Sequence, residues 1–166
     1  MVIRYPPSGT ADPTMKQKPA TPQAILKHIR TLAPDKVRIA VTDLDAILRG
    51  KVISGEKFLS LAGSGFGFCD VIFGWDASDA LYDNVRYTGW HTGFPDASAR
   101  IDLSTFRTIP WDGNMPFFLG DFSEKNGKPL AVCPRSLLKR IRGECLKMGF
   151  NPVFSEEFEW FNFEET

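Results

Sequence analysis

The sequence predicts an α+β protein, with one mixed domain up to about residue 130 and a single helix–strand unit after it. Two segments, 22–33 and 134–148, repeat apolar residues at helical spacing. Between them, short β-branched or alternating runs are separated by Gly, Asn, Asp and Pro, which is typical of strands joined by turns. The chain has 166 residues, of which 43% are hydrophobic, so it is long enough to bury a sizeable core.

The first half of the chain predicts a tail, a helix, a hairpin and a short helix. Residues 1–20 are rich in Pro, Thr and Lys without apolar periodicity, and they predict a flexible tail. Thr21-Pro22 is a typical helix N-cap followed by proline, and Pro34 closes that helix. The elements predicted after it are strands over 37–42 and 47–53, joined by the turn 43–46, and a short helix over 54–59.

The second half predicts mainly strands, followed by one more helix. Its most distinctive segments are an apolar strand that runs directly into Asp76 and a helix that starts at Pro134 and stops before Gly149. In chain order the predicted elements are strands over 68–75, 99–103, 106–110 and 115–122, a hairpin turn over 123–128 with 130–133 pairing back, the helix over 134–148, and a strand over 154–163.

A long loop, 76–96, separates two of these strands. It contains Tyr82, Tyr87, Trp90 and His91 together with four aspartates. Loops of this length and composition tend to be lids or interface segments, and the alternative is a loop packed on its own domain. His91 alone is weak evidence for a catalyst.

The segment 154–163 places two carboxylates among large aromatic residues. In a strand, Glu157 and Glu159 share one face, and Phe158 and Trp160 share the other. Two like charges about 7 Å apart are costly unless a cation lies between them, and a divalent ion with oxygen ligands would serve. The alternative is an edge strand whose solvent face happens to carry two glutamates.

Charge and cysteine content exclude several classes of partner. Lys plus Arg and Asp plus Glu both number 20, and no basic stripe is visible, which argues against nucleic acid as a partner. Cys69, Cys133 and Cys145 lack the spacing of zinc sites and predict reduced thiols. The sequence shows no signal peptide or membrane-spanning run, so we expect a soluble, cytoplasmic protein without a membrane partner.

From about residue 21 onward, a collinear set of motifs resembles the glutamine synthetase family. The motifs are Arg49-Gly50-Lys51, Trp75-Asp76, Pro95-Asp96-Ala97-Ser98, Cys133-Pro134-Arg135-Ser136 and Glu157-Phe158-Glu159-Trp160-Phe161-Asn162-Phe163. The stretch Tyr87-Thr88-Gly89-Trp90-His91-Thr92-Gly93 is similar to the glutamine-synthetase-like branch that includes γ-glutamyl-amine ligases. The resemblance implies a β-grasp domain over 21–130 and, over 131–166, the beginning of an incomplete α+β catalytic domain.

The resemblance also implies an activity and roles for three residues. The activity is ATP-dependent amidation of the glutamate γ-carboxylate by ammonia or an amine, through γ-glutamyl phosphate, in a ring-like homo-oligomer. Glu157 and Glu159 would bind Mg²⁺ or Mn²⁺, and Asp76 would bind and deprotonate ammonium in the active site of a neighbouring subunit. The residues that hold the ATP co-substrate lie largely outside this sequence, so we expect the 166-residue chain to be inactive alone.

The sequence departs from the family pattern at one place, and it leaves two alternative functions open. Ammonium-using members carry Gly-Ser-Ser after the aspartate, whereas this chain has Ala77-Ser78-Asp79, which leaves a larger amine possible. The first alternative function is a non-catalytic, glutamine-synthetase-like assembly protein. The second is a free-standing β-grasp binding module.

Overall fold

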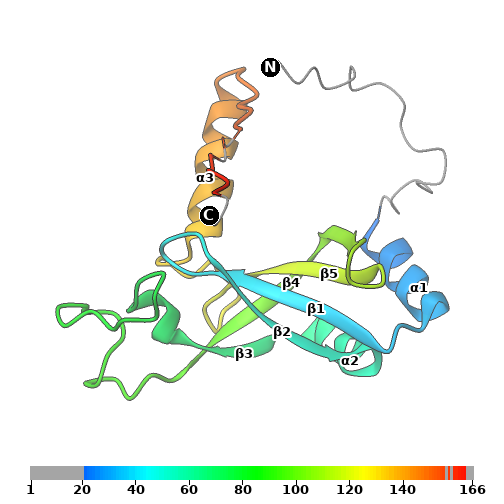
Figure 1. Ribbon diagram of the computed structural model, residues 1–166, viewed down its shortest axis with the longest axis horizontal. Coiled ribbons are helices and arrows are strands. Elements are labelled where there is room, and N and C mark those ends of the chain that lie inside the picture. The colour runs from blue at the N-terminus through cyan, green and yellow to red at the C-terminus, as the bar shows by residue number, and fades with distance from the viewer. Residues whose placement is uncertain (1–20, 156, 158, 164–166) are drawn as a thin grey trace.

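The computed structural model describes residues 21–155, 157 and 159–163, and the predicted tail 1–20 lies outside them. Within these residues one five-stranded sheet organises the fold, with three α-helices and one 3-10 helix beside it (Figure 1). The helices are α1 (Pro22–Leu32), α2 (Gly55–Ser64), the 3-10 helix η1 (Asp70–Phe73) and α3 (Pro134–Lys147), and the strands are β1 (Lys36–Thr42), β2 (Leu48–Ser54), β3 (Phe66–Cys69), β4 (Asp96–Ile109) and β5 (Met115–Phe122).

The strands lie in the order β2-β1-β5-β4-β3. The central strand, β5, is parallel to its neighbour β1, with Ile39 opposite Phe118, and all other neighbouring strands in this sheet are antiparallel. The first hairpin leads into α2, which crosses the sheet before the chain returns as β3. This arrangement confirms the expected α+β class with a β-grasp sheet.

Local chemistry explains where the first two helices begin and end. The Thr21 hydroxyl accepts the N–H of Ala24 at 3.2 Å at the start of α1, and Ser54 accepts that of Lys57 at 3.1 Å at the start of α2. Helix α2 stops at Gly65, whose φ of +81° suits glycine. A Cβ there would lie 2.5 Å from a backbone oxygen of β4, so no larger residue fits.

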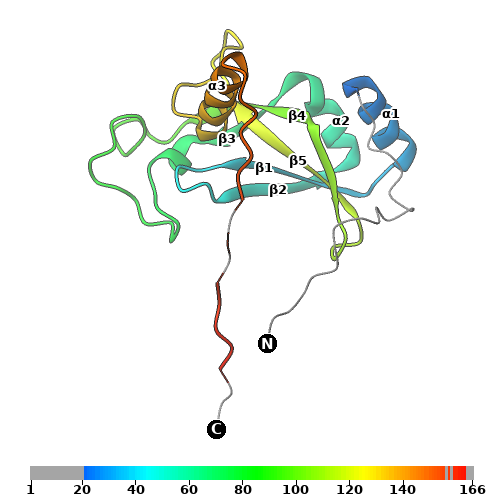
Figure 2. The same cartoon turned by 90° about the horizontal axis from the view of Figure 1, so that it is seen from above.

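The main core lies between the sheet and helices α1 and α2, which cover one of its faces (Figure 2). Phe118 of β5 is at its centre, with ring centroids 4.5 Å from Phe58 of α2 and 5.4 Å from Phe106 of β4. Ile25 and Ile29 of α1 are also buried there, as their helical spacing predicts. The opposite face of the sheet carries a smaller cluster formed by Ala40, Ile109 and Phe117.

The predicted strand 68–75 is wrong beyond Cys69, where β3 gives way to the 3-10 helix η1. The apolar run is buried as expected, since Ile72 and Phe73 are in the core. However, burial does not distinguish a strand from a helical turn in so short a run. The buried carboxylate of Asp70 accepts a hydrogen bond from Thr88 at 2.6 Å, a contact that the sequence does not reveal.

Two predicted strand boundaries also require correction. Segments 99–103 and 106–110 belong to one strand, β4, whose pairing with β5 is irregular between Asp102 and Arg107. At this irregularity the N–H of Leu119 donates to the Thr105 hydroxyl at 2.8 Å, so a side chain replaces a backbone acceptor. Residues 130–133 do not form a strand, and the pairing there is a single bridge between Ser123 and Pro129.

Helix α3 stands away from the sheet (Figure 1) and buries none of its own residues. Its predicted apolar stripe is therefore exposed, as shown by Leu137, Ile141 and Met148. The described residues that follow α3 extend away from the sheet (Figure 2), and none of them lies in a strand. The predicted strand over 154–163 is wrong for those residues, because no neighbouring strand edge supplies its hydrogen bonds.

Candidate functional site

Asp76 lies in a closed turn at the start of the long loop between η1 and β4. Its Oδ1 atom accepts the N–H groups of Ser78 at 2.8 Å and Ala80 at 3.0 Å, and its own N–H donates to the Ala80 carbonyl at 3.0 Å. These bonds fix the direction of the carboxylate. Within the described part of the chain, Oδ2 of Asp76 receives no hydrogen bond, so it is free to accept one from a ligand.

The guanidinium of Arg49, on β2, reaches the Asp76 turn. Nη1 donates to Asp79 Oδ1 at 2.5 Å and Nη2 to the Asp76 carbonyl at 3.3 Å, while Cζ lies 4.9 Å from the centre of the Trp75 ring. Nε donates to Oδ2 of Asp43 at 2.7 Å. The hydrogen bond to Asp43 raises the pKa of Arg49, outweighing the lowering by burial, so the guanidinium keeps its charge.

Asp43 is fully buried just after β1, and its side chain bonds residues that follow it closely in the chain. Its Oδ1 accepts the N–H groups of Asp45 at 3.0 Å and Ile47 at 2.9 Å, which shapes the β1–β2 turn. Its Oδ2 accepts from Arg49. Of the two cations in the motif Arg49-Gly50-Lys51, Arg49 therefore meets a buried carboxylate, whereas the Lys51 ammonium contacts the Gly67 carbonyl at 3.2 Å.

Tyr82 reports the electrostatic character of this region. Its pKa is raised, first by burial and then by the negative charges of Asp45, Asp76 and Asp43. Each of these causes disfavours the phenolate. The same carboxylates favour a cation over an anion beside the Asp76 turn. The sequence does not single out Tyr82 as a site residue, since two of these carboxylates, Asp43 and Asp45, are distant from it in the chain.

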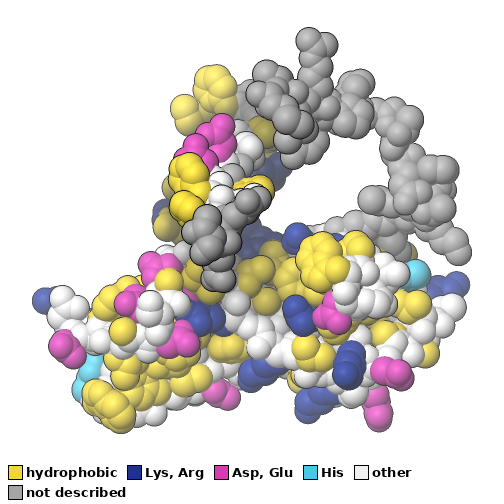
Figure 3. Space-filling view, viewed as in Figure 1, with side chains coloured by type: hydrophobic (Ala, Val, Ile, Leu, Met, Phe, Trp, Pro, Cys, Tyr) yellow, Lys and Arg dark blue, Asp and Glu magenta, His cyan; other side chains and the backbone are white. Residues whose placement is uncertain are grey.

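The base of the loop is packed on its own domain. Thr88 is buried and donates to Asp70, and the Tyr87 ring lies edge-on to Phe73 with centroids 5.6 Å apart. By contrast, the side chain of Trp90 is 84% exposed. Hydrophobic side chains gather on the surface over this loop (Figure 3). The base therefore matches the packed alternative, whereas the tip keeps the exposed aromatic surface typical of an interface segment.

A cavity of about 260 Å³ lies under the loop, next to the segment that carries Tyr82. Its walls combine apolar and aromatic side chains with the polar side chains of Asp83 and Thr88, a mixture that suits a small organic ligand. His91 lines it too, and Nε2 of His91 lies 3.2 Å from the Arg86 carbonyl. The main lining residues are Leu81, Tyr82, Val85, Trp90 and Phe94.

Glu157 and Glu159 are exposed on the extended segment after α3. Carboxylate oxygens are suitable donors for Mg²⁺ or Mn²⁺, but two carboxylates are too few to complete a coordination shell. Among the described residues, no group of three or more His, Cys, Asp or Glu side chains could hold a metal ion. No hydrogen bond or ion pair in that part of the chain connects Asp76 with either glutamate.

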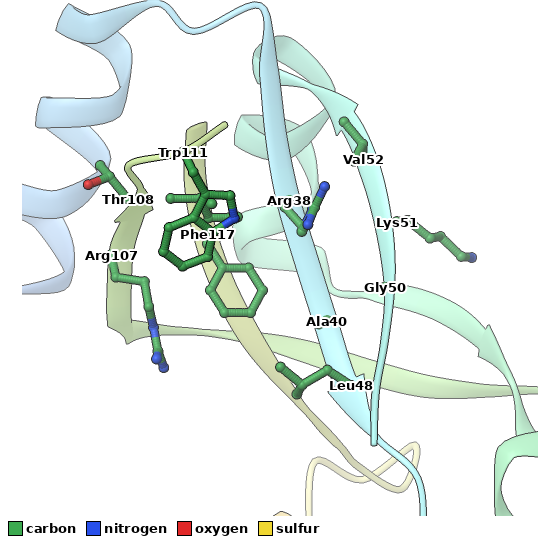
Figure 4. Close-up of a pocket in the computed structure, with 11 residues that line it drawn as sticks. Arg38, Ala40, Leu48, Gly50, Lys51, Val52, Arg107, Thr108, Trp111 and Phe117 are labelled. Atoms are coloured by element: carbon green, nitrogen blue, oxygen red, sulfur yellow. The ribbon is translucent and has the colours of Figure 1, made fainter. Parts of the chain in front are cut away.

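The open face of the sheet forms a shallow cleft of about 490 Å³ (Figure 4). Its floor includes Ala40 and Phe117, and the exposed Trp111 lies beside Phe117. Two cations flank it: Arg107 stacks on Phe117 at 5.3 Å, and Arg38 pairs with a carboxylate of the β4–β5 turn at 3.2 Å. An apolar floor between cations is a surface that a protein partner could cover.

A cluster of four charged side chains attaches α3 to the sheet. Arg135 bonds Asp102 at 2.9 Å and Asp121 at 2.6 Å, and Lys139 bonds the same two carboxylates at 2.7 and 2.5 Å. Burial raises the pKa of Asp102, but hydrogen bonds from Lys139, Ser104 and Arg135 outweigh it and hold that pKa well below its usual range. The two carboxylates lie on neighbouring strands, β4 and β5.

Comparison with known proteins identifies the family of this chain, which the geometry of the described residues does not. Type-1 glutamine synthetase 2 of Dictyostelium discoideum is 54% identical over 142 residues, which cover 86% of this chain and 27% of that protein. Glutamate–isopropylamine ligase of Pseudomonas sp is 35% identical over 128 residues, or 76% of this chain and 28% of the ligase. The matched part of the chain belongs to the glutamine synthetase family.

The chain spans little more than a quarter of the length of these relatives. No family model matches it. Solved structures support the fold: Plasmodium falciparum glutamine synthetase aligns with a TM-score of 0.56 at 20% identity, over 76% of this chain and 23% of that one. A structure described as a novel glutamine synthase homolog gives a TM-score of 0.54, also at 20% identity, over 69% of this chain and 27% of that one.

Proposed function

We propose that this chain is the N-terminal part of an ATP-dependent ligase that joins ammonia or an amine to the γ-carboxylate of glutamate, through γ-glutamyl phosphate. The observation that carries the proposal is the 54% identity, over 142 residues, to a protein named as a glutamine synthetase. The second relative is named as a ligase of glutamate and isopropylamine. In this proposal residues 21–130 form the β-grasp domain and 131–166 begin the catalytic domain.

Asp76 is the proposed amine-binding group. One of its carboxylate oxygens is held by the turn, and the other accepts no hydrogen bond from the described residues, so its lone pairs are free for a ligand. The surrounding carboxylates, which raise the pKa of Tyr82, favour an ammonium ion on arrival. An ammonium ion must lose a proton before it can attack the acyl phosphate, and in this proposal Asp76 accepts that proton.

The amine is ammonia or a larger organic amine. Asp79 replaces a small residue of ammonium-using members, but its carboxylate is bonded to Arg49 and is not directed at a substrate. Tyr82 lines the cavity under the loop, and the charge of Asp76 contributes to the raised pKa of Tyr82. In this proposal an amine held by Asp76 therefore directs its organic substituent toward that cavity. One relative is named as a γ-glutamylethanolamide synthetase, which supports including organic amines.

A divalent ion, Mg²⁺ or Mn²⁺, is part of the proposal, with ATP as co-substrate. Glu157 and Glu159 would each give the ion one carboxylate, and further ligands must come from outside the described residues. When bound, such an ion neutralises the phosphate oxygens during phosphoryl transfer. The described residues by themselves do not form a complete metal site.

We further propose that the protein works as a ring-like homo-oligomer in the cytoplasm. The open sheet face, with its apolar floor and flanking arginines, and the exposed tip of the loop both offer surface for a second copy. The thiols of Cys69, Cys133 and Cys145 are free, as expected in a reducing compartment. No helix in the described part of the chain is both long and apolar enough to cross a membrane.

The test is a chimera in which the matched residues of this chain replace the corresponding 142-residue region of the Dictyostelium discoideum relative. We expect the chimera to release phosphate in a manner that requires ATP, glutamate and an amine. Changing Asp76→Asn should lower kcat/KM for the amine about 100-fold, because the proton acceptor is lost. The matched control, Asp35→Asn, changes an exposed aspartate just before β1, at the end of that strand opposite Asp43, and should have little effect.

Two results would contradict the proposal. A folded chimera that assembles but has no activity would support the non-catalytic assembly protein instead. A chimera in which Asp76→Asn is as active as the unsubstituted protein would remove the role assigned to Asp76. The 166-residue chain alone should be inactive in the same assay, because it lacks most ligands for the nucleotide and the metal.

A further inference from the structure

Arg49 uses all three nitrogen positions of its guanidinium, and it uses them for two different purposes. Nε is bonded to the buried Asp43, which belongs to the β1–β2 turn. Nη1 and Nη2 are bonded to Asp79 and to the Asp76 carbonyl, which belong to the loop. The guanidinium therefore joins the sheet to the turn that presents the Asp76 carboxylate.

The sheet end of this connection is rigid. Arg49 pairs with Val41 across the β1–β2 ladder, and its side chain is only 17% exposed. Asp43 is held by two backbone N–H groups in addition to Arg49, so its carboxylate cannot rotate freely. The Trp75 ring covers the guanidinium from one side. A planar cation bonded at several positions loses little entropy for each bond it makes.

The loop end depends on the connection. Asp79 has a φ of +66°, in the left-handed region that residues other than glycine seldom adopt. Its carboxylate accepts from Arg49 at 2.5 Å, and its N–H donates to the Asp76 carbonyl at 3.1 Å. The Asp76 carbonyl thus accepts hydrogen bonds from both Asp79 and Arg49. Removing Arg49 leaves the turn closed only by its own short-range bonds.

We infer that Arg49 is a positioning residue for Asp76, and that Asp79 is the loop anchor through which Arg49 acts. Arg49 does not touch the substrate: it sets the place of the turn, and the turn sets the direction of the Asp76 carboxylate. Only the catalytic consequence of this inference rests on the proposed function. The placing of the turn is measurable in the 166-residue chain without any activity.

Amide hydrogen exchange in that chain tests the placing. We expect Arg49→Met to speed exchange of the Ser78 and Ala80 amides, which donate to Asp76, at least 10-fold, with the amides of β1 changed less than twofold. Arg49→Lys should give an intermediate effect, because an ammonium can meet one carboxylate but cannot reproduce the planar fork. The control Arg38→Met removes another arginine–aspartate pair of the sheet and should leave both loop amides unchanged.

A second variant, Asp79→Asn, tests the same contact in case Arg49→Met destabilises the whole chain. Asp79 is exposed, and asparagine tolerates a left-handed backbone, so this variant weakens the contact without disturbing the core. We expect at least a threefold increase in exchange at Ser78 and Ala80. Unchanged exchange at these two amides in Asp79→Asn would overturn the inference, whatever the effect of Arg49→Met on the whole chain.

The chimera then separates this inference from the proposed function. Arg49→Lys should raise KM for the amine about 10-fold while KM for glutamate stays within twofold, because only the amine meets the Asp76 turn. A change in both KM values, or in neither, would contradict the catalytic consequence. An inactive chimera with the expected exchange pattern in the 166-residue chain would reject the proposed function and leave the positioning role of Arg49 intact.

Discussion

The attachment of α3 to the sheet can be tested by changing Arg135→Met. This substitution keeps a long apolar stem but removes the guanidinium that bonds Asp102 and Asp121. Helix α3 buries none of its own side chains, so these charge-assisted bonds, with those of Lys139, form the main polar link between the helix and the sheet. Breaking them should release the helix before the sheet unfolds.

The size of the effect follows from the burial of the two carboxylates. Their side chains are 17% and 20% exposed, so they are partly buried. An ion pair at the surface contributes less than about 1 kcal/mol, whereas a buried hydrogen bond to a charged group contributes about 1.5–3 kcal/mol. Lys139 still bonds both carboxylates in the variant, so neither is left unpaired. We therefore expect Arg135→Met to lower the free energy of unfolding by about 2 kcal/mol at pH 7.

Acid should reduce the same stabilisation. The pKa of Asp102 lies below its usual range in the folded chain because of Lys139, Ser104 and Arg135, which outweigh the opposite effect of burial. A lowered pKa stabilises the fold above the unfolded value of about 4, and this stabilisation is lost as the pH falls toward the folded value. The loss has a slope of at most about 1.4 kcal/mol per pH unit. Asp102→Asn should abolish this contribution.

Urea unfolding at pH 7, combined with amide exchange along α3, measures both effects. The control Lys147→Met removes an exposed pair with Glu144 on the same helix, and it should change stability by less than about 0.5 kcal/mol. The reasoning would be refuted if Arg135→Met left amide exchange along α3 unchanged and lowered the free energy of unfolding by less than about 0.5 kcal/mol. A pH dependence below pH 4 that is identical with and without Asp102 would refute the electrostatic part.

Three further predictions concern the core, a glycine and the loop, each measured by thermal or urea unfolding. Phe118→Ala should cost about 3–5 kcal/mol, because the ring is fully buried and stacked, and a loss below about 1 kcal/mol would contradict its central place. Gly65→Ala should cost more than about 1 kcal/mol, because φ is +81° and a β4 oxygen blocks the Cβ, whereas Gly63→Ala has open space in α2 and should be neutral or stabilising. Thr88→Val should cost about 1–3 kcal/mol by leaving the buried Asp70 without its donor, and equal stability would show that the pair contributes little.

The sequence by itself determined the elements whose signals are local. The caps at Thr21 and Ser54 and the turn at Asp43–Ala46 lie close to the predicted positions, since each depends on contacts within four residues. The order of motifs was enough to recognise the family, which the similarity to glutamine synthetases confirms. The metal-binding role of Glu157 and Glu159 stays a prediction, as does the role of Asp76.

Only the tertiary structure decided which charged groups meet. Arg49 reaches a partner thirty positions away, and Arg135 reaches one thirty-three positions away, distances in sequence at which spacing carries no information. The tertiary structure also decides that β3 ends at Cys69 and that the apolar stripe of α3 is exposed. Hydrophobic periodicity shows which residues can be buried, but the neighbouring element decides whether they are, because burial and hydrogen bonding require a partner surface.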